Sequence, residues 1–154
     1  MKNNNEIKKL NNKGFSLVEL IIVIAIMAVL IGVLAPQYLK YVERSRNSSD
    51  QDNAAAIASA MQVWGAETDF GGKKAFTAGT GVVTVNATGG SITTENNTSA
   101  VSDALTNAGI TIANVKCTSK TKWTSYTVTA TIDANGTVTT AIQYLDASGA
   151  IVTP

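Results

Sequence analysis

The sequence predicts an α+β fold in which a long N-terminal helix lies against a small antiparallel sheet. Two observations carry this prediction. Residues 15–35 form one apolar run in which only Ser16, Glu19 and Gly32 depart from apolar character. Residues 125–132 alternate strictly between apolar and polar side chains, and residues 137–145 resume the alternation. A period of two is typical of half-buried strands, and a long apolar run is typical of a helix. The length of 154 residues leaves room for about one domain.

The charge is low overall and unevenly placed. Apolar residues make up 45% of the chain and charged residues 15%, with a net charge of +1. Nucleic-acid-binding domains usually carry a basic stripe, so no nucleic-acid partner is predicted. Residues 1–14 carry a local charge of +3 and the other residues one of −2. A basic leader before a slightly acidic body indicates targeting.

Two absences narrow the function further. The sequence contains no histidine, which removes the commonest general base and metal ligand. Its single cysteine, Cys117, has no partner for an intramolecular disulfide. We interpret Cys117 as a small buried apolar residue rather than a reactive thiol. No catalytic residue, cofactor or metal site is predicted, and the chain is not expected to be an enzyme.

The apolar run has the length of a membrane span. About 20 apolar residues cross the bilayer core as a helix, and the basic leader places the N-terminus in the cytoplasm. A cleaved secretory signal is a poorer interpretation, since the run is too long and no small-x-small site follows it. A plain anchor leaves Glu19 unexplained, because a carboxylate at mid-membrane costs roughly 3 kcal/mol.

The junction of leader and apolar run carries a specific motif. Residues 13–19 read Lys-Gly-Phe-Ser-Leu-Val-Glu. They resemble the class III signal of type IV prepilins, with Gly14 before the cut, Phe15 after it and Glu19 fifth in the mature chain. The resemblance covers about residues 1–60. It implies cleavage by a prepilin peptidase between Gly14 and Phe15, and methylation of the new Phe15 amine.

The same resemblance implies a structural role. A type IV pilin is held in the cytoplasmic membrane as a single-pass precursor. An assembly platform protein and an ATPase then add it to a helical homopolymer on the cell surface, which serves adhesion, twitching motility or biofilm formation. Glu19 and Phe15 are the expected assembly residues. Alternatives are a minor pilin, a pseudopilin of a type II secretion or DNA-uptake system, or a membrane-anchored binding domain that does not polymerise.

Helical character is expected to continue to about residue 68. An apolar stripe at Ala54, Ile57, Met61 and Trp64 predicts a face that lies against the sheet. The segment from Gly32 to Pro36 is the expected weak point, where proline leaves a carbonyl unpaired and pilins can lose helicity on assembly. The polar residues 47–50 are a second soft spot. The predicted divisions of the chain are 1–14 (leader), 15–36 (span), 37–68 (amphipathic helix) and 69–154 (head).

A group of charged residues follows the apolar run, namely Lys40, Glu43, Arg44 and Arg46. One interpretation is a solvated helix face just outside the membrane. The other is intersubunit charge pairing or attraction to anionic lipid, which favours basic side chains near the membrane surface. The sequence leaves both open.

The head is predicted from short patterns. Residues 82–85 form a short strand, 86–97 are rich in turns, and 99–108 form a helix with Ser99 as its cap. Residues 125–132 and 137–145 form a hairpin, and 150–152 add a third strand. Trp64 and Trp123 are expected in the core. The lack of a second cysteine, where many Gram-negative pilins have a disulfide, favours a Gram-positive type and leaves the strand order open.

Overall fold

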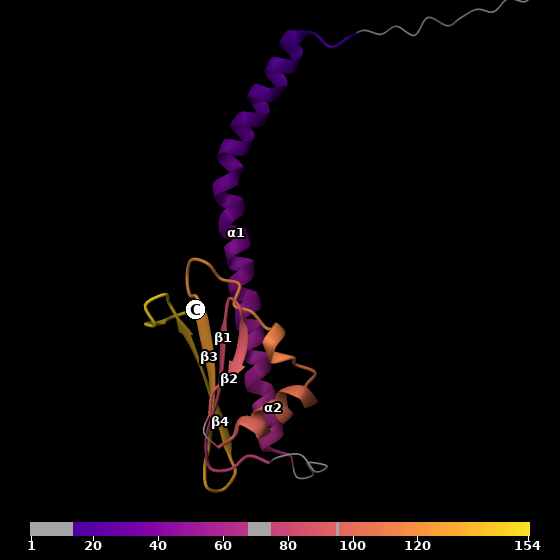
Figure 1. Ribbon diagram of the computed structural model, residues 1–154. Coiled ribbons are helices and arrows are strands. Elements are labelled where there is room, and N and C mark those ends of the chain that lie inside the picture. The colour runs from indigo at the N-terminus through magenta and orange to yellow at the C-terminus, as the bar shows by residue number, and fades with distance from the viewer. Residues whose placement is uncertain (1–13, 68–74, 95) are drawn as a thin grey trace, which may run out of the picture. The chain divides into compact units, whose positions relative to one another are not determined.

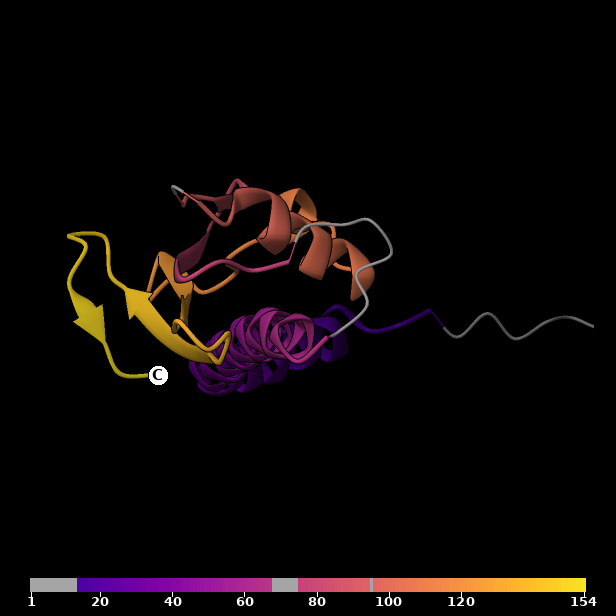
Figure 2. The same cartoon turned by 90° about the horizontal axis from the view of Figure 1, so that it is seen from below.

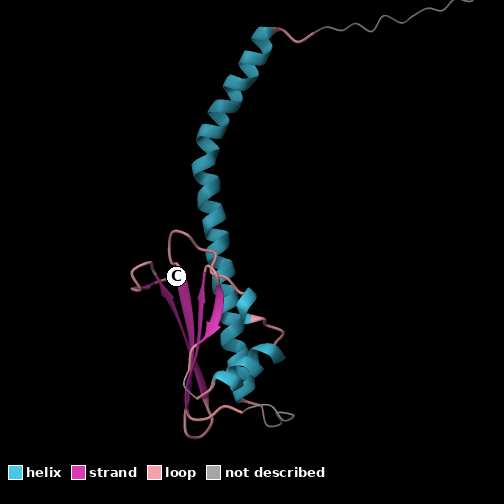
Figure 3. Ribbon diagram, in the orientation of Figure 1, coloured by secondary structure: helices cyan, strands magenta, loops and turns pink. Residues whose placement is uncertain are grey.

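The computed structural model describes residues 14–67, 75–94 and 96–154. The elements follow one another as α1 (Leu17–Gly65), β1 (Gly79–Asn86), β2 (Gly89–Ile92), α2 (Thr98–Asn107), a 3-10 turn (Ile112–Asn114), β3 (Ser125–Ile132), β4 (Val138–Leu145) and β5 (Ile151–Val152) (Figures 1 and 3). Contacts divide the chain into a first unit ending at Leu39 and a second unit, Lys40–Pro154. This is the predicted α+β, pilin-like fold.

The first unit consists of the apolar part of α1. Its large apolar side chains from Phe15 to Leu34 are between 50% and 91% exposed. The helix is apolar on every side here, so no face is distinguished as the one that packs on a core. By length and composition, α1 is the one described helix that can cross a membrane. Helical structure passes through Gly32 and Pro36 without a break.

The second unit is built on a five-stranded sheet in the order β2-β1-β3-β4-β5, with every neighbouring pair antiparallel. The predicted hairpin is confirmed, since β3 and β4 pair from Ile132 opposite Val138 to Ser125 opposite Leu145. The third strand is confirmed as β5. Within the second unit, the part of α1 after Leu39 runs along one side of this sheet, and α2 lies next to that part of the helix (Figure 2).

The core lies between the inner face of the sheet and the second part of α1. The predicted stripe is confirmed, because Ala54, Ile57, Met61 and Trp64 are all buried. Ala54, Ile57 and Met61 belong to the same apolar cluster as Val83, Tyr126 and Val128 from the strands. Period-2 strands and a 3.6-period helix present these side chains to one another. Trp123 is also buried, as expected.

Strand β2 was not expected, because residues 86–97 were predicted as turns. Its sequence, Gly-Gly-Ser-Ile, has little intrinsic preference for a strand. The turn before it is fixed by Asn86, whose side-chain oxygen accepts hydrogen bonds from the N–H groups of Thr88 and Gly89 at 2.9 and 3.2 Å. A Cβ at Gly90 would lie 2.7 Å from Ile112 atoms, so packing against the 3-10 turn requires glycine there. Tertiary contact therefore decides this strand.

The predicted helix 99–108 is confirmed as α2, but the predicted cap is wrong. The N-cap position is Asn97, and no side chain caps the helix. The amide of Asn97 is buried and instead bonds Thr77 and Thr80, which tie the start of β1 to α2. Local sequence favoured Ser99 because serine is a good cap, but long-range hydrogen bonding fixed the boundary.

Candidate functional site

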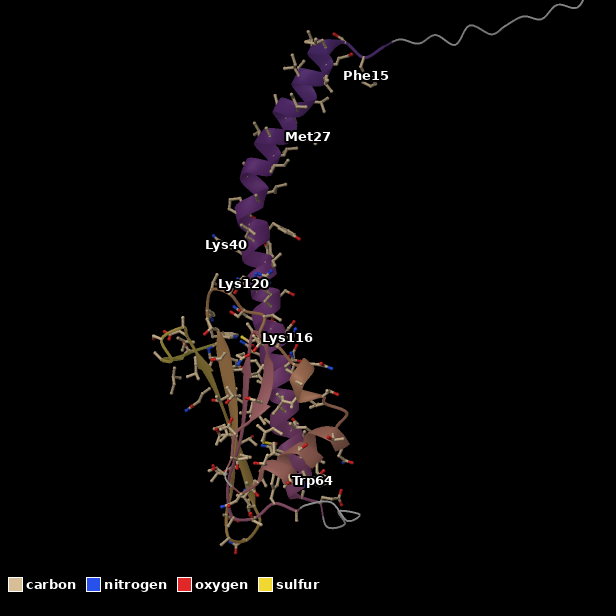
Figure 4. All side chains as sticks on the ribbon, in the orientation of Figure 1. Phe15, Met27, Lys40, Trp64, Lys116 and Lys120 are labelled. Carbon is tan, nitrogen blue, oxygen red and sulfur yellow. The ribbon has the colours of Figure 1, made fainter. Side chains whose placement is uncertain are left out.

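The start of α1 carries the residues that the sequence singled out. Phe15 is 91% exposed at the beginning of the helix (Figure 4). Gly14 is exposed, and a Cβ built on it would meet no atom of the described residues within 4 Å. Its φ also lies outside the left-handed region that favours glycine. Neither space nor backbone conformation in the folded chain therefore requires glycine at position 14.

Glu19 is part of a hydrogen-bonded cap on α1. Its carboxylate accepts a hydrogen bond from the Ser16 backbone N–H at 2.9 Å, and the Ser16 hydroxyl accepts one from the Val18 N–H at 3.3 Å. The pattern Ser-x-x-Glu before an apolar run is a capping box, which satisfies N–H groups that the first helical turn leaves free. Sequence reasoning missed this role, although the spacing of Ser16 and Glu19 was a sufficient signal for it.

The cap places a negative charge next to the predicted cleavage point. The Ser16 nitrogen that Glu19 binds is one residue from the Phe15 nitrogen. Cleavage after Gly14 would turn that nitrogen into a charged amine. A carboxylate in the first turn of a helix is also favoured by the helix dipole. Phe15 and Glu19 are thus brought together at one end of α1, whereas Gly32 and Pro36 lie far along the helix.

A second polar cluster lies in the head, where α1 holds an irregular loop. We call it the loop anchor: Glu43 and Asp50 of α1 with the loop 117–123. Asp50 is fully buried and accepts hydrogen bonds from the N–H groups of Thr118 and Ser119 at 2.8 and 2.9 Å. It accepts another from the Trp123 indole at 2.9 Å. The thiol of Cys117 and the hydroxyl of Thr118 complete its shell. A buried carboxylate is stable only with such donors.

Glu43 holds the other end of the loop. One carboxylate oxygen accepts the N–H groups of Lys120 and Thr121 at 2.6 and 2.9 Å, and the second pairs with Arg46 at 3.3 Å. Burial acts to raise the pKa of Glu43, but hydrogen bonds from the backbone of Lys120 and Thr121, and from the hydroxyls of Thr121 and Ser119, lower it to about 2. The interpretation of Glu43 as part of a solvated helix face is therefore wrong, because its side chain is 14% exposed and is bonded to the loop.

The loop anchor also changes the interpretation of residues 47–50 and of Cys117. The Asp50 side chain bonds the loop and not its own backbone. The Ser49 hydroxyl does donate to the Ser45 carbonyl at 3.1 Å, as expected for a soft spot, and α1 is nevertheless helical here. Cys117 is buried, as predicted. Burial, together with the negative charge of Asp50, raises the pKa of its thiol to about 12. It is therefore a protonated donor and not a nucleophile at neutral pH. Among the described residues, no group of His, Cys, Asp or Glu could hold a metal ion.

Comparison with known proteins bears on the first of these two regions. A family described as "Prokaryotic N-terminal methylation motif" matches residues 9–35. The chain carries the N-terminal methylation motif of type IV prepilins. The matched prepilin motif contains the Gly14–Phe15 junction, Glu19 and the apolar run up to Ala35.

Two relatives share the N-terminal part of the chain. The type IV major pilin protein PilA of Myxococcus xanthus (strain DK1622) is 36% identical over 58 residues, which is 38% of this chain and 26% of that protein. The prepilin peptidase-dependent protein A of Clostridium perfringens (strain 13 / Type A) is 36% identical over 63 residues, 41% of this chain and 45% of that protein. The matches thus span less than half of either relative's length. No solved structure matches the chain.

Proposed function

We propose that this chain is the structural subunit of a type IV pilus. Its precursor is held in the cytoplasmic membrane by one span, with residues 1–14 inside. A prepilin peptidase cuts it between Gly14 and Phe15, the new amine is methylated, and the subunit polymerises with itself into a surface filament. The observation that carries this proposal is the register of Gly14, Phe15 and Glu19 within the matched motif, directly ahead of an exposed apolar helix.

The exposed glycine supports processing at this junction. Gly14 has open space around its Cα and an ordinary backbone conformation. Since the folded chain does not need glycine there, the need is better placed with an enzyme that must approach the backbone closely. The relative from Clostridium perfringens is named as prepilin peptidase-dependent, which fits the same processing.

The apolar helix supports polymerisation. Its side chains are exposed in the isolated chain, and water is a poor surrounding for them. Lipid and a bundle of like helices are almost equally apolar, so transfer from one to the other has little hydrophobic cost. Packing and polar contacts then decide whether subunits associate, and Glu19 is the charged residue within residues 15–35.

Two other functions share some of these observations. A minor pilin, or a pseudopilin of a type II secretion or DNA-uptake system, has the same signal and differs in abundance. A membrane-anchored binding domain keeps its leader and never polymerises. A pilus subunit, a minor pilin and a pseudopilin would all require an assembly platform protein and a cytoplasmic ATPase as partners, whereas an anchored binding domain would not. A structural role is favoured over an enzymatic one by the named pilin relative.

The N-terminus of the surface protein tests the proposal directly. Filaments sheared from cells should yield a chain that begins at Phe15 and carries one added methyl group, as measured by intact-protein mass spectrometry. A Gly14→Val precursor should stay in the membrane with its leader attached. Surface protein that begins at Met1 or Lys2 would contradict processing and favour the anchored binding domain.

The proposed role of Glu19 in filament assembly can be separated by mutation from its role in capping α1. Glu19→Gln keeps an oxygen that can accept the Ser16 N–H, as glutamine does in capping boxes, but it removes the charge. If Glu19 pairs with a Phe15 amine in the filament core, Glu19→Gln and Glu19→Ala should both give a stable, membrane-inserted protein with few or no filaments. Either substitution removes the carboxylate and leaves the Phe15 amine unpaired in the filament core. A buried charge without its partner is strongly destabilising.

Filaments can be counted by electron microscopy in strains that make only the native chain, only Glu19→Gln or only Glu19→Ala, at matched protein levels. Restoration of filaments by Glu19→Gln but not by Glu19→Ala would assign Glu19 to capping alone. Normal filament numbers with both variants would remove it from assembly altogether.

A further inference from the structure

We propose that the second unit carries a cationic collar that docks on an anionic membrane surface while the precursor is held in the membrane. The collar consists of basic residues from two distant segments: Lys40, Arg44, Arg46, Lys120 and Lys122. This inference rests on the proposed function in one respect, namely that residues 15–35 lie in a membrane before assembly. Its partner is the phosphate headgroup layer of acidic lipids, and it requires no further protein.

The loop anchor brings the two basic segments together. Glu43, three residues after Lys40, accepts the backbone N–H groups of Lys120 and Thr121 at 2.6 and 2.9 Å. The loop therefore lies directly on the turn of α1 that carries Lys40 and Arg44. Figure 4 shows Lys40 and Lys120 at the same end of the second unit. The sequence separates these residues by about 80 positions, so their meeting is visible only in the structure.

Four of the five collar residues are exposed, and the five cations outnumber the three nearby carboxylates, Glu43, Asp50 and Asp146. Lys40, Arg44, Lys120 and Lys122 are exposed, and no ion pair is formed by any of them among the described residues. The nearby acids have other tasks. Glu43 holds the loop and Arg46, and Asp50 is fully buried. Asp146 lines the same surface hollow as Lys120 and Lys122, and its carboxylate binds the Ser148 and Ala150 N–H groups. Positive charge therefore predominates at this end.

A membrane surface fits this place in the chain. Lys40 follows the apolar run by five residues, which reach at most about 18 Å even when extended. Tyr38 lies between the run and the collar and Tyr41 directly follows Lys40, and these tyrosines are 69% and 64% exposed. Exposed tyrosines at the end of an apolar helix are typical of the membrane–water interface. Basic side chains just beyond that interface are favoured by anionic leaflets. The apolar run is thus followed first by tyrosines interleaved with Lys40 and then by further cations, as expected for a chain that leaves a bilayer core through the interface.

Lys116 provides a matched internal control. It is an exposed lysine at the start of the same loop, but it lines a hollow with Asn53 and Ala56 of α1. Asn53 is ten residues beyond Glu43, about 15 Å along a helix. That separation exceeds the screening length of about 8 Å at physiological salt. An anionic surface should therefore affect Lys120 and Lys122 and leave Lys116 unchanged.

The experiment uses the full-length chain in lipid nanodiscs, either of phosphatidylcholine alone or with phosphatidylglycerol added. Lysine acylation by a water-soluble ester is followed residue by residue by mass spectrometry. We expect phosphatidylglycerol to slow acylation of Lys120 and Lys122 roughly fivefold, with no change at Lys116. High salt should remove the protection. Lys40→Gln/Arg44→Gln should weaken the protection at Lys120 and Lys122, whereas Lys116→Gln should not.

Three other outcomes would overturn docking of the collar on an anionic membrane. Equal rates in both lipids would show that the collar does not dock on the bilayer. Protection by soluble glycerol phosphate in neutral nanodiscs would assign it to free anions. Protection that rises with protein density in neutral lipid would assign it to a second copy of the chain. Failure of the chain to enter either nanodisc would instead contradict the membrane-held precursor, so the two failures are distinguishable.

Discussion

Asp50 of α1 is a fully buried carboxylate, and a buried charge is destabilising unless hydrogen-bond donors surround it. Asp50 has no exposed surface, yet donors from residues 117–123 surround its two oxygens. Hydrogen bonds to a charged group are worth about 1.5–3 kcal/mol each, so the shell offsets the cost of removing the charge from water. The chain has only one cysteine and cannot close this loop with an intramolecular disulfide. Two carboxylates of α1, Asp50 and Glu43, hold it instead.

We predict that Asp50→Asn destabilises the second unit by about 2–4 kcal/mol, because the amide presents its own donors to N–H groups that need acceptors. Asp52→Asn, at an exposed site two residues further on, should change stability by less than about 0.5 kcal/mol. Urea unfolding of the detergent-solubilised chain, followed by tryptophan fluorescence, measures both. Equal effects of the two substitutions would contradict an anchoring role for Asp50.

At the scale of elements, local pattern and distant contact divide the chain between them. The hairpin β3–β4 and the buried stripe of α1 could be predicted, since their periods are written in consecutive residues. Strand β2 and the course of the loop 117–123 could not. Strand β2 depends on Gly90, which leaves room for Ile112. The course of the loop depends on Glu43 and Asp50, which lie about 70 residues earlier in the chain. No local window contains either signal.

The loop should therefore be sensitive to acid. In the folded chain the pKa of Glu43 lies near 2, below its ordinary value of 4.5. A depressed pKa means that this group stabilises the fold fully above about pH 4.5, and that the contribution is lost as the pH falls toward 2. We predict that Glu43→Gln is less stable than the native chain at pH 7 and that the difference narrows by pH 3.

Unfolding midpoints in urea across this range measure the effect. Asp146, whose pKa is also lowered by the Ser148 hydroxyl and nearby backbone N–H groups, contributes acid sensitivity to both proteins and cancels in the comparison. A difference that stays constant with pH would show that the loop does not depend on the charge of Glu43.

At the scale of the whole molecule, the chain separates into a unit that needs a partner and a unit that has its own core. The first unit, ending at Leu39, exposes its apolar side chains. The second unit, Lys40–Pro154, contains the described buried cluster and the entire sheet. Solubility and folding should therefore depend on different parts of the chain.

We predict that a fragment beginning at Gln37 is a soluble, folded monomer, because the long apolar run ends at Ala35. Its melting temperature should not change in reducing agent, since Cys117 is single and buried. The thiol should also resist iodoacetamide until the fragment unfolds, because its pKa is raised to about 12. Light scattering, calorimetry and mass spectrometry test the three expectations. A lower melting temperature in reductant would reveal a disulfide between chains.

The prepilin motif, the long apolar helix and the central hairpin can all be read from consecutive residues. In each of these features, residues close together in the sequence carry the whole signal. The signal is the spacing of Gly14, Phe15 and Glu19 in the motif, the continuous apolar run in the helix, and the period of two in the hairpin strands. The extra strand, the start of α2, the loop anchor and the placement of Lys120 near Lys40 become visible only in the folded chain. Each of these depends on a hydrogen bond or a close contact between residues far apart in the chain. Such pairs are chosen by the packed fold, because burial makes an unpaired polar group costly wherever its partner lies in the sequence.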